Sequence, residues 1–329
     1  MSGNELTKDQ EAGKPAFWFF NFSRSQAIGR GDRIFKASTA FFAFLVLALA
    51  MLTVGALFYN SIPCFKAMGW RFLVTSDWDP IQNVFGAVPF VYGTLVSSAI
   101  ALLIAAPLGL GISLFLTELA PMKLREPVAF LVEILAAIPS VVYGLWGMFV
   151  LAPIMRTWVD PVLHRVIGGP FFGEGATELS LFTAGSILSI MILPTITAIT
   201  REVFEAVPNV YRESARALGA TSWETIQLSV LKSSKPGIVG ALMLGLGRAL
   251  GETMAVTMVI GNSPQVTANL LAPGHSMASV IANEFTEATG DVYLAALSEI
   301  GLLLMGITLV LNIAAHLLVW LTTRNYARN

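Results

Sequence analysis

Six long stretches of mainly apolar residues divide the chain, and polar segments connect them. The stretches cover about residues 38–59, 92–117, 127–152, 179–200, 237–262 and 294–322. Each is close to the roughly 20 residues that a helix needs to cross the apolar core of a bilayer. Alternating segments of about ten residues, as in a membrane β-barrel, do not occur in the sequence. The pattern therefore predicts an all-α integral membrane protein with six transmembrane helices.

Composition supports this prediction, because 55% of the 329 residues are hydrophobic and only 12% are charged. A mean hydropathy of +0.70 is too high for a soluble domain of this length. We expect a cytoplasmic N-terminal segment over 1–37 and a first transmembrane helix with a periplasmic loop over 38–91. A core of five further helices then covers 92–323, and a short cytoplasmic tail covers 324–329.

The lysines and arginines indicate which connections are cytoplasmic. With both termini inside, fifteen of them fall in inner segments and four in outer loops. Positive residues near the ends of spans are normally held on the cytoplasmic side. The remaining basic residue, Arg248, lies inside a span. The only cysteine, Cys64, falls in the predicted first outer loop, so an intramolecular disulfide and a thiolate metal cluster are both excluded.

The fifth apolar stretch holds two opposite charges, Arg248 and Glu252, in a run rich in glycine. An ionisable side chain at the bilayer centre costs at least about 2.5–3.5 kcal/mol, so it normally lines a polar path or holds a partner. In a continuous helix, residues four apart share a face, which predicts that the two side chains can touch. Arginine matches an oxyanion with two parallel hydrogen bonds, which favours an anion-transport role. A pair that only fixes helix packing is the alternative.

The longest inner connection, 201–235, carries nine charged residues and is predicted to form two short helices. Pro208 suits the first turn of a helix that continues to about Leu218. Gly219 can take the left-handed conformation that closes a helix. Thr221 and Glu224 have the spacing of a capping box that starts the next helix. The segment is therefore expected to be a rigid elbow that docks a partner, and an ordinary interfacial connector is the alternative.

The elbow also has the spacing of the EAA motif of ABC-importer permeases, with the matching residues Glu213, Ser214, Ala215 and Gly219. The chain resembles this family over about residues 80–325. Two positions depart from the motif, since Ser214 replaces an alanine and Lys232 stands where a proline is usual.

Two further runs are similar to those of phosphate importer permeases within this family, at 138–144 (IPSVVYG) and 245–256 (GLGRALGETMAV). The resemblance implies the type I importer fold, which is MetI-like, with the EAA segment as a cytoplasmic coupling helix. It also implies that Arg248, Glu252 and Thr253 line the route of inorganic phosphate across a bacterial inner membrane.

The partners implied by the resemblance are a second homologous permease, an ATPase dimer, a periplasmic phosphate-binding protein and the surrounding lipids, with no nucleic acid. The chain contains no G-x-x-x-x-G-K-[ST] loop, so ATP hydrolysis by that route requires another subunit. We therefore expect a transport subunit that is not itself an enzyme and holds no cofactor or metal, with ATP and Mg²⁺ bound by the ATPase.

Three alternatives remain at this point. The same machinery with a different oxyanion would tolerate the same charged residues. An ion-coupled secondary anion transporter would also lack the phosphate loop, but it has no need of the EAA elbow. A membrane-embedded enzyme is disfavoured, because no nucleophile with a matching base and no metal-ligand spacing is apparent.

Overall fold

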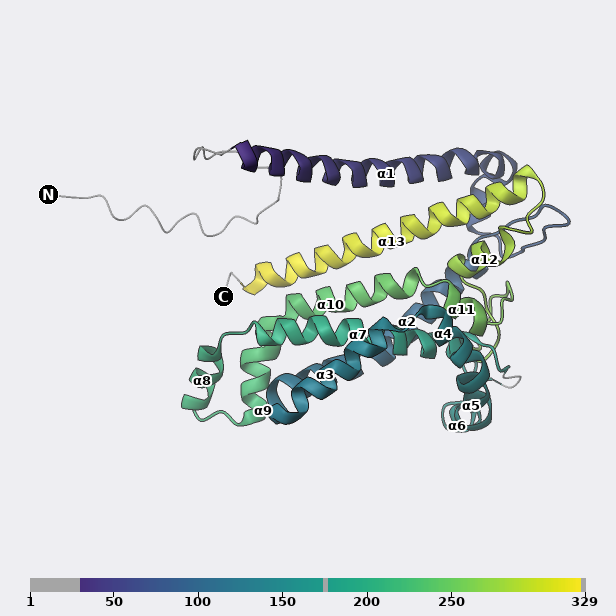
Figure 1. Ribbon diagram of the computed structural model, residues 1–329. Helices are drawn as coiled ribbons and strands as arrows, with labels where there is room; N and C mark the ends of the chain where they lie inside the picture. Colours follow the sequence, from purple (N-terminus) through teal and green to yellow (C-terminus); the bar gives the residue numbers. More distant parts are fainter. Residues whose placement is uncertain (1–29, 174–176, 327–329) are drawn as a thin grey trace. The chain divides into compact units, whose positions relative to one another are not determined.

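The computed structural model describes residues 30–173 and 177–326, and most of these residues are helical (Figure 1). Most of the predicted N-terminal segment, up to residue 29, and the last three residues of the predicted tail lie outside the described residues. The α-helices are α1 (Arg30–Met68), α2 (Val88–Leu114), α3 (Met122–Ala137), α4 (Ser140–Trp146), α5 (Ala152–Ile154), α6 (Asp160–Val166), α7 (Leu181–Glu205), α8 (Asn209–Ala217), α9 (Ser222–Thr225), α10 (Lys232–Leu250), α11 (Met254–Val259), α12 (Met277–Glu284) and α13 (Asp291–Tyr326).

Short helical turns of other types extend several of these helices. A 3₁₀ turn, η1 (Gly69–Leu73), follows α1, and the remaining four are π-helical turns. They are η2 (Phe115–Leu119) after α2, η3 (Gly147–Leu151), η4 (Met155–Val159) and η5 (Ile226–Leu231), which joins α9 to α10. Over the described residues, β pairing is limited to one bridge between Asp79 and Val84.

The chain divides into two compact units within α1. Of the first unit, residues 1–53, the structure describes the initial part of α1, an apolar run that suits a lipid environment. The second unit, 54–329, holds all the other elements, and the following paragraphs concern this unit alone.

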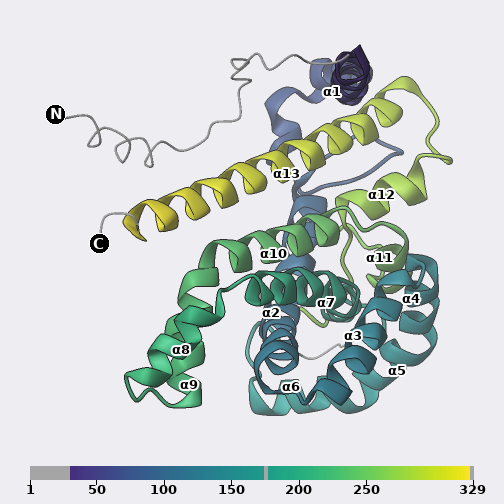
Figure 2. The same cartoon turned by 60° about the vertical axis from the view of Figure 1, so that its left-hand side comes forward.

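Helix α7 is the centre of the second unit, because most of its length is buried between other helices. Its apolar residues pack with α2, α4 and α11 in a core that includes Ile187, Ile192 and Val259. Helix α10 lies beside α7, as both views show (Figures 1 and 2). The hydroxyls of Ser113, Ser186 and Ser189 donate to carbonyls of the preceding turn, which pairs these donors inside the apolar core.

Two smaller apolar clusters lie elsewhere in the unit. One joins the end of α1, the 74–87 loop, α12 and α13 around Phe72, Phe85 and Tyr293. The other packs Phe204, Val207 and Val230 beneath α8 and η5. Helices α8 and α9 project at one end of the unit, and α11 and α12 lie at the opposite end (Figures 1 and 2). The elbow and the loops predicted to be periplasmic therefore lie at opposite ends of this unit.

Five stretches of helix are long and apolar enough to cross a membrane within the described part of the chain: Gly31–Leu73, Val88–Leu119, Ser140–Val166, Leu181–Glu205 and Asp291–Leu317. Four of them contain the first, second, fourth and sixth predicted stretches almost completely. The other two predicted stretches differ from the structure.

The predicted span 127–152 is interrupted in its middle. Ile138 and Pro139 both have extended backbone, so α3 ends at Ala137 and α4 begins at Ser140. Proline cannot donate the hydrogen bond that a continuing helix needs. The freed carbonyl of Leu135 accepts a hydrogen bond of 2.7 Å from the Tyr143 hydroxyl. The apolar helix at this point starts at Ser140 instead and runs to Val166.

The predicted span 237–262 is also not one helix, because α10 ends at Leu250 and α11 begins at Met254. The short helix α11 then ends at Val259, and an irregular segment follows. One further position differs from expectation. Cys64 lies inside α1 and not in an outer loop, and it is fully buried next to Glu299 of α13.

Candidate functional site

The end of α10 separates the two charges that the sequence placed on one helical face. Gly251 closes the helix, and its N–H donates to the carbonyl of Gly247 at 3.3 Å. The guanidinium of Arg248 is exposed and donates from Nη1 to the Thr195 hydroxyl of α7 at 3.0 Å. No ion pair joins Arg248 to Glu252. The predicted contact is wrong, because the chain leaves the helix between the two residues.

Glu252 instead belongs to the start of α11. Its Oε1 accepts a hydrogen bond of 3.2 Å from the backbone N–H of Ala255. A carboxylate is favourable there, because the first N–H groups of a helix have no partner within it and carry partial positive charge. Thr253 is the residue before α11, and its carbonyl accepts bonds from both the N–H and the hydroxyl of Thr257. Arg248, Glu252 and Thr253 therefore border one helix break and are all at least partly exposed.

The glycines of α10 serve two different purposes. A Cβ on Gly245 would lie 2.8 Å from the Ile196 side chain of α7, so this glycine permits close packing of the two helices. Gly247 has open space in the Cβ direction, with nothing within 4 Å. Packing against α7 thus fixes one side of α10, and the segment around Arg248 stays open on another.

The elbow at the other end of the unit follows the sequence prediction closely. Helix α8 starts after Pro208, and Gly219 has a left-handed φ of 88°. The N–H of Gly219 donates to the carbonyl of Arg216 at 2.9 Å, and the N–H of Ala220 donates to the carbonyl of Ala215 at 3.1 Å. These two bonds form a Schellman motif, which satisfies the last carbonyls of the helix.

The next helix is closed at its start by the predicted capping box. The Thr221 hydroxyl accepts from the N–H of Glu224 at 3.3 Å, and the Glu224 carboxylate accepts from the N–H of Thr221 at 2.8 Å. The hydrogen bonds from the backbone N–H and the hydroxyl of Thr221 lower the pKa of Glu224. A Schellman end and a capping box so close together hold the turn at Gly219 in one conformation.

Three of the four EAA residues lie on α8, and Gly219 follows it. Glu213 and Ser214 are exposed, and Ala215 is partly buried. The Ser214 hydroxyl donates to the Val210 carbonyl within the helix at 2.7 Å, so serine occupies this position without an unpaired donor. Large apolar side chains on the same elbow are also exposed, and these were not predicted from the sequence: Val210, Tyr211, Leu218, Trp223 and Leu228. Such a surface is typical of a protein interface.

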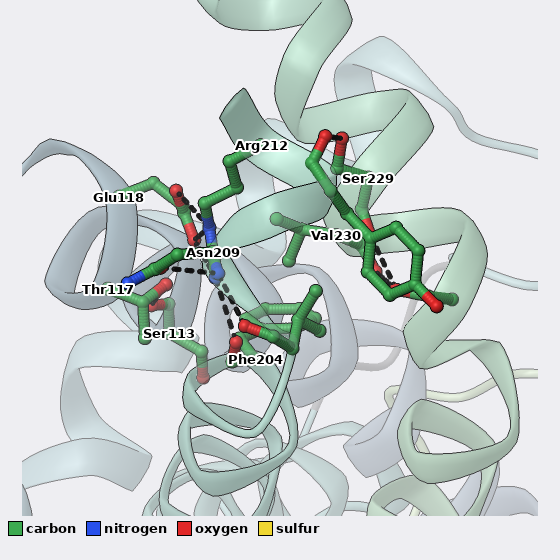
Figure 3. A network of polar contacts seen from close by, with 11 residues as sticks. Ser113, Thr117, Glu118, Phe204, Asn209, Arg212, Ser229 and Val230 are labelled. Atoms are coloured by element: carbon green, nitrogen blue, oxygen red, sulfur yellow. Dashed lines mark hydrogen bonds and ion pairs between the residues drawn. The ribbon is translucent and has the colours of Figure 1, made fainter. Parts of the chain in front are cut away.

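A largely buried ion pair beneath the elbow was also missed by sequence reasoning. Arg212 of α8 contacts Glu118 of η2 at 2.7 Å, and their side chains are only 12% and 9% exposed (Figure 3). Figure 3 shows the guanidinium pointing between Glu118 and the backbone at Phe204. The two residues are 94 positions apart, and neither belongs to a recognisable local pattern. The sequence offered only one signal for this pair. An acidic residue directly follows the second apolar stretch, and a basic residue lies in the elbow.

Comparison with known protein families identifies the chain. Residues 108–322 match the family described as "Binding-protein-dependent transport system inner membrane component". The chain belongs to this family. It is therefore an inner membrane component of an ABC transporter, as the EAA spacing indicated.

Individual relatives are similar over almost their whole length. The chain is 47% identical to the phosphate transport system permease protein PstC of Mesorhizobium japonicum, with 90% of this chain and 92% of the relative covered. Identity is 45% to PstC of Haemophilus influenzae, with 88% and 93% covered. It is 37% to a probable PstC of Methanocaldococcus jannaschii, with 85% and 90% covered.

Solved structures confirm the predicted fold. An inward-facing MetNI methionine ABC transporter has a chain with a TM-score of 0.54 and 17% identity, which covers 75% of this chain and 99% of its own length. A bacterial ABC transporter involved in alginate import gives a TM-score of 0.53 at 17% identity, with 87% and 98% covered. Both show that this family member has the MetI-like permease fold.

Proposed function

We propose that this chain is the permease subunit of an ATP-driven importer of inorganic phosphate and forms half of the translocation pathway. The observation that supports this most directly is an exposed arginine within the apolar stretch 237–262, Arg248, in a chain that is 45–47% identical to PstC permeases. A guanidinium exposed among apolar helices requires a polar path or a partner. Phosphate offers oxygens that match its fork.

The helix break at Gly251 supports the same proposal. Three polar residues, Arg248, Glu252 and Thr253, border the break and leave it accessible. Broken helices are tolerated at membrane depth where they line a water-filled cavity or are buried in protein. In this arrangement Arg248 attracts the anion, and the Glu252 carboxylate weakens its binding enough to permit release.

A second homologous permease completes the pathway in this proposal. The polar residues around Arg248 are exposed in the single chain, so another chain is needed to enclose them. We place an ATPase dimer against the exposed apolar side chains of α8 and α9, and a periplasmic phosphate-binding protein against the outer loops. ATP and Mg²⁺ bind to the ATPase subunits, and both termini of the permease lie in the cytoplasm.

The proposed cycle uses the elbow as the mechanical link. ATP binding closes the ATPase dimer and displaces α8, which is held at a fixed angle by the Gly219 turn. The membrane helices that continue from the elbow then move, and the cavity opens to the periplasm. The binding protein delivers phosphate to this cavity, and ATP hydrolysis restores the inward-facing state.

Uptake of radiolabelled phosphate into proteoliposomes that contain the complete complex tests this proposal. We expect ATP-dependent uptake by the wild type and its loss in Arg248→Gln, with equal assembly of both complexes. Glu252→Gln is a useful companion, because the amide oxygen can still accept the Ala255 N–H bond and preserve α11.

Two controls separate the alternatives. Competition by unlabelled sulfate, molybdate or arsenate at equal concentration distinguishes phosphate from other oxyanions. Uptake that survives ATP removal and stops with an uncoupler would indicate a secondary transporter and contradict the proposal. Full uptake by Arg248→Gln would show that Arg248 is not needed for transport and would favour a role in helix packing.

A further inference from the structure

One largely buried guanidinium joins three elements at the inner end of the second unit. Arg212 of α8 approaches Glu118 of η2 with both Nε and Nη2, at distances of 2.7–3.3 Å. Its Nη2 also donates to the carbonyl of Phe204 at 2.9 Å, and its Nη1 donates to the carbonyl of Val207 at 2.6 Å. The side chain therefore ties α8 to the end of α2 and to the end of α7 at once (Figure 3).

The chemistry of this junction makes it stiff. The carbonyls at the end of a helix have no partner within it, and a cation is favoured there. Arginine presents its donors in a fixed planar fork, which fits a carboxylate and neighbouring carbonyls in one orientation. Removing one partner of a buried ion pair leaves the other charge without compensation, so the pair resists separation.

Neighbouring hydrogen bonds brace the same region. The Ser229 hydroxyl of η5 donates to the Tyr211 carbonyl of α8 at 2.9 Å. The Ser113 hydroxyl of α2 donates to the Thr197 carbonyl of α7 at 2.9 Å, so the two membrane helices are also joined to each other. Helix α8 is thus held on one side by η5 and on the other by Arg212.

We propose that Arg212 and Glu118 are positioning residues that make α8 and the inner ends of α2 and α7 move as one rigid body. This inference rests on the proposed function, since it concerns how displacement of α8 reaches the pathway. Without the junction, a displacement of α8 would only bend the short connections that join it to α7 and α9. With the junction, the displacement is passed to α2 and α7.

The first test measures phosphate uptake and ATP hydrolysis in the same proteoliposomes and compares their ratio. Glu118→Gln and Arg212→Lys should each lower uptake per ATP hydrolysed by about two- to thirtyfold, the range expected for a changed coupling energy. Arg201→Gln is the matched control, because the Arg201–Glu205 pair at 3.2 Å lies within α7 and joins no second element. Its ratio should equal that of the wild type.

Glu118→Gln is the decisive variant, because it lies outside the elbow and leaves the α8 surface intact. The ATPase subunits should copurify with it as they do with the wild type. An unchanged ratio in both variants would overturn the proposal. Loss of the ATPase from Glu118→Gln would also overturn it, because the pair would then only maintain the docking surface.

A second measurement does not depend on phosphate. Spin labels at the exposed positions 119 and 216, in a Cys64→Ala background, report the distance between η2 and α8. In the assembled complex this distance should be the same without nucleotide and after trapping with ATP and vanadate. It should change on trapping in Glu118→Gln. Equal behaviour of the two complexes would contradict the rigid junction, even if the transported solute were not phosphate.

Discussion

The guanidinium of Arg248 is held by the hydroxyl of Thr195 on the neighbouring helix, with 3.0 Å between Nη1 and Oγ1. This bond, and not an ion pair with Glu252, sets the direction of the arginine in the single chain. The remaining donors of the fork are thereby left available for an anion. Thr195 becomes a residue of interest that the sequence alone did not indicate.

Substitutions of Thr195 and Arg248 should have effects on uptake that are not independent of each other. Thr195→Val removes the hydroxyl at nearly constant volume, and Arg248→Lys removes the fork but keeps the charge. We expect each to lower ATP-dependent uptake by about tenfold, the value of one hydrogen bond or slightly more. The double variant should lose less than the product of the two effects, because both remove one interaction.

Thr195→Ser is the control for the first substitution, since it retains the hydroxyl and should keep nearly wild-type uptake. Strictly multiplicative losses in the double variant would show that the bond between Arg248 and Thr195 does not serve transport. Wild-type uptake by Arg248→Lys would favour a structural role for the charge.

Substitution of Gly219 should disturb the elbow specifically. Its φ of 88° costs a residue with a Cβ about 1–2 kcal/mol, and a β-branched residue most. We expect Gly219→Val to weaken the coupling of ATP hydrolysis to uptake while the protein still inserts into the membrane. Gly219→Asn should be much milder, because asparagine adopts the left-handed conformation more readily. The ratio of uptake to hydrolysis checks both, and equal ratios for the two variants would contradict the role of this turn.

The elbow could be predicted from the sequence because local chemistry determines it. A glycine at the helix end and the Thr221–Glu224 capping box specify their conformations within a few residues. The six apolar stretches were likewise evident, although Pro139 divides one of them. Periodicity alone located the apolar runs but did not show where a helix ends inside one.

The Arg248–Glu252 contact was mispredicted for this reason. A continuous helix would have brought the two side chains together, but Gly251 ends α10 and Glu252 caps α11. The Arg212–Glu118 pair was missed for a different reason, since its partners are 94 positions apart and meet only where the fold brings η2, α7 and α8 together. Long-range polar contacts of this kind leave no local pattern in one sequence.

Two glycines of α2 should respond in opposite directions to the same change. A Cβ on Gly93 would lie 2.0 Å from the His275 carbonyl, so Gly93→Ala must displace the backbone next to α12. We expect it to destabilise the protein by about 1–3 kcal/mol, as overpacking does. Gly111 has nothing within 4 Å in the Cβ direction, and Gly111→Ala should stabilise the helix by about 0.5–1 kcal/mol. Thermal unfolding in one detergent compares the two variants, and similar shifts would refute the close approach at Gly93.

Acid should destabilise the end of the second unit that holds α12 through His275. This side chain is 2% exposed, and its Nδ1 lies 2.7 Å from the Ser279 hydroxyl while its ring contacts Phe90. Burial lowers the pKa of His275 from 6.5 to about 4, partly offset by a hydrogen bond with the backbone of Ser276. The folded protein therefore keeps the imidazole neutral at a pH where the unfolded chain is already protonated.

The sign of the effect follows from that difference. A depressed histidine pKa gives stability that is complete above pH 6.5 and is lost as the pH falls from 6.5 towards 4. The loss attributable to His275 should reach about 3 kcal/mol at the acid end. Melting temperatures of wild type and His275→Gln, measured from pH 7 to pH 4, separate the contribution of His275 from the rest, because the other titrating groups are common to both proteins. The variant should lose less stability than the wild type over this interval, and parallel curves would show that His275 can accept a proton without disturbing the fold.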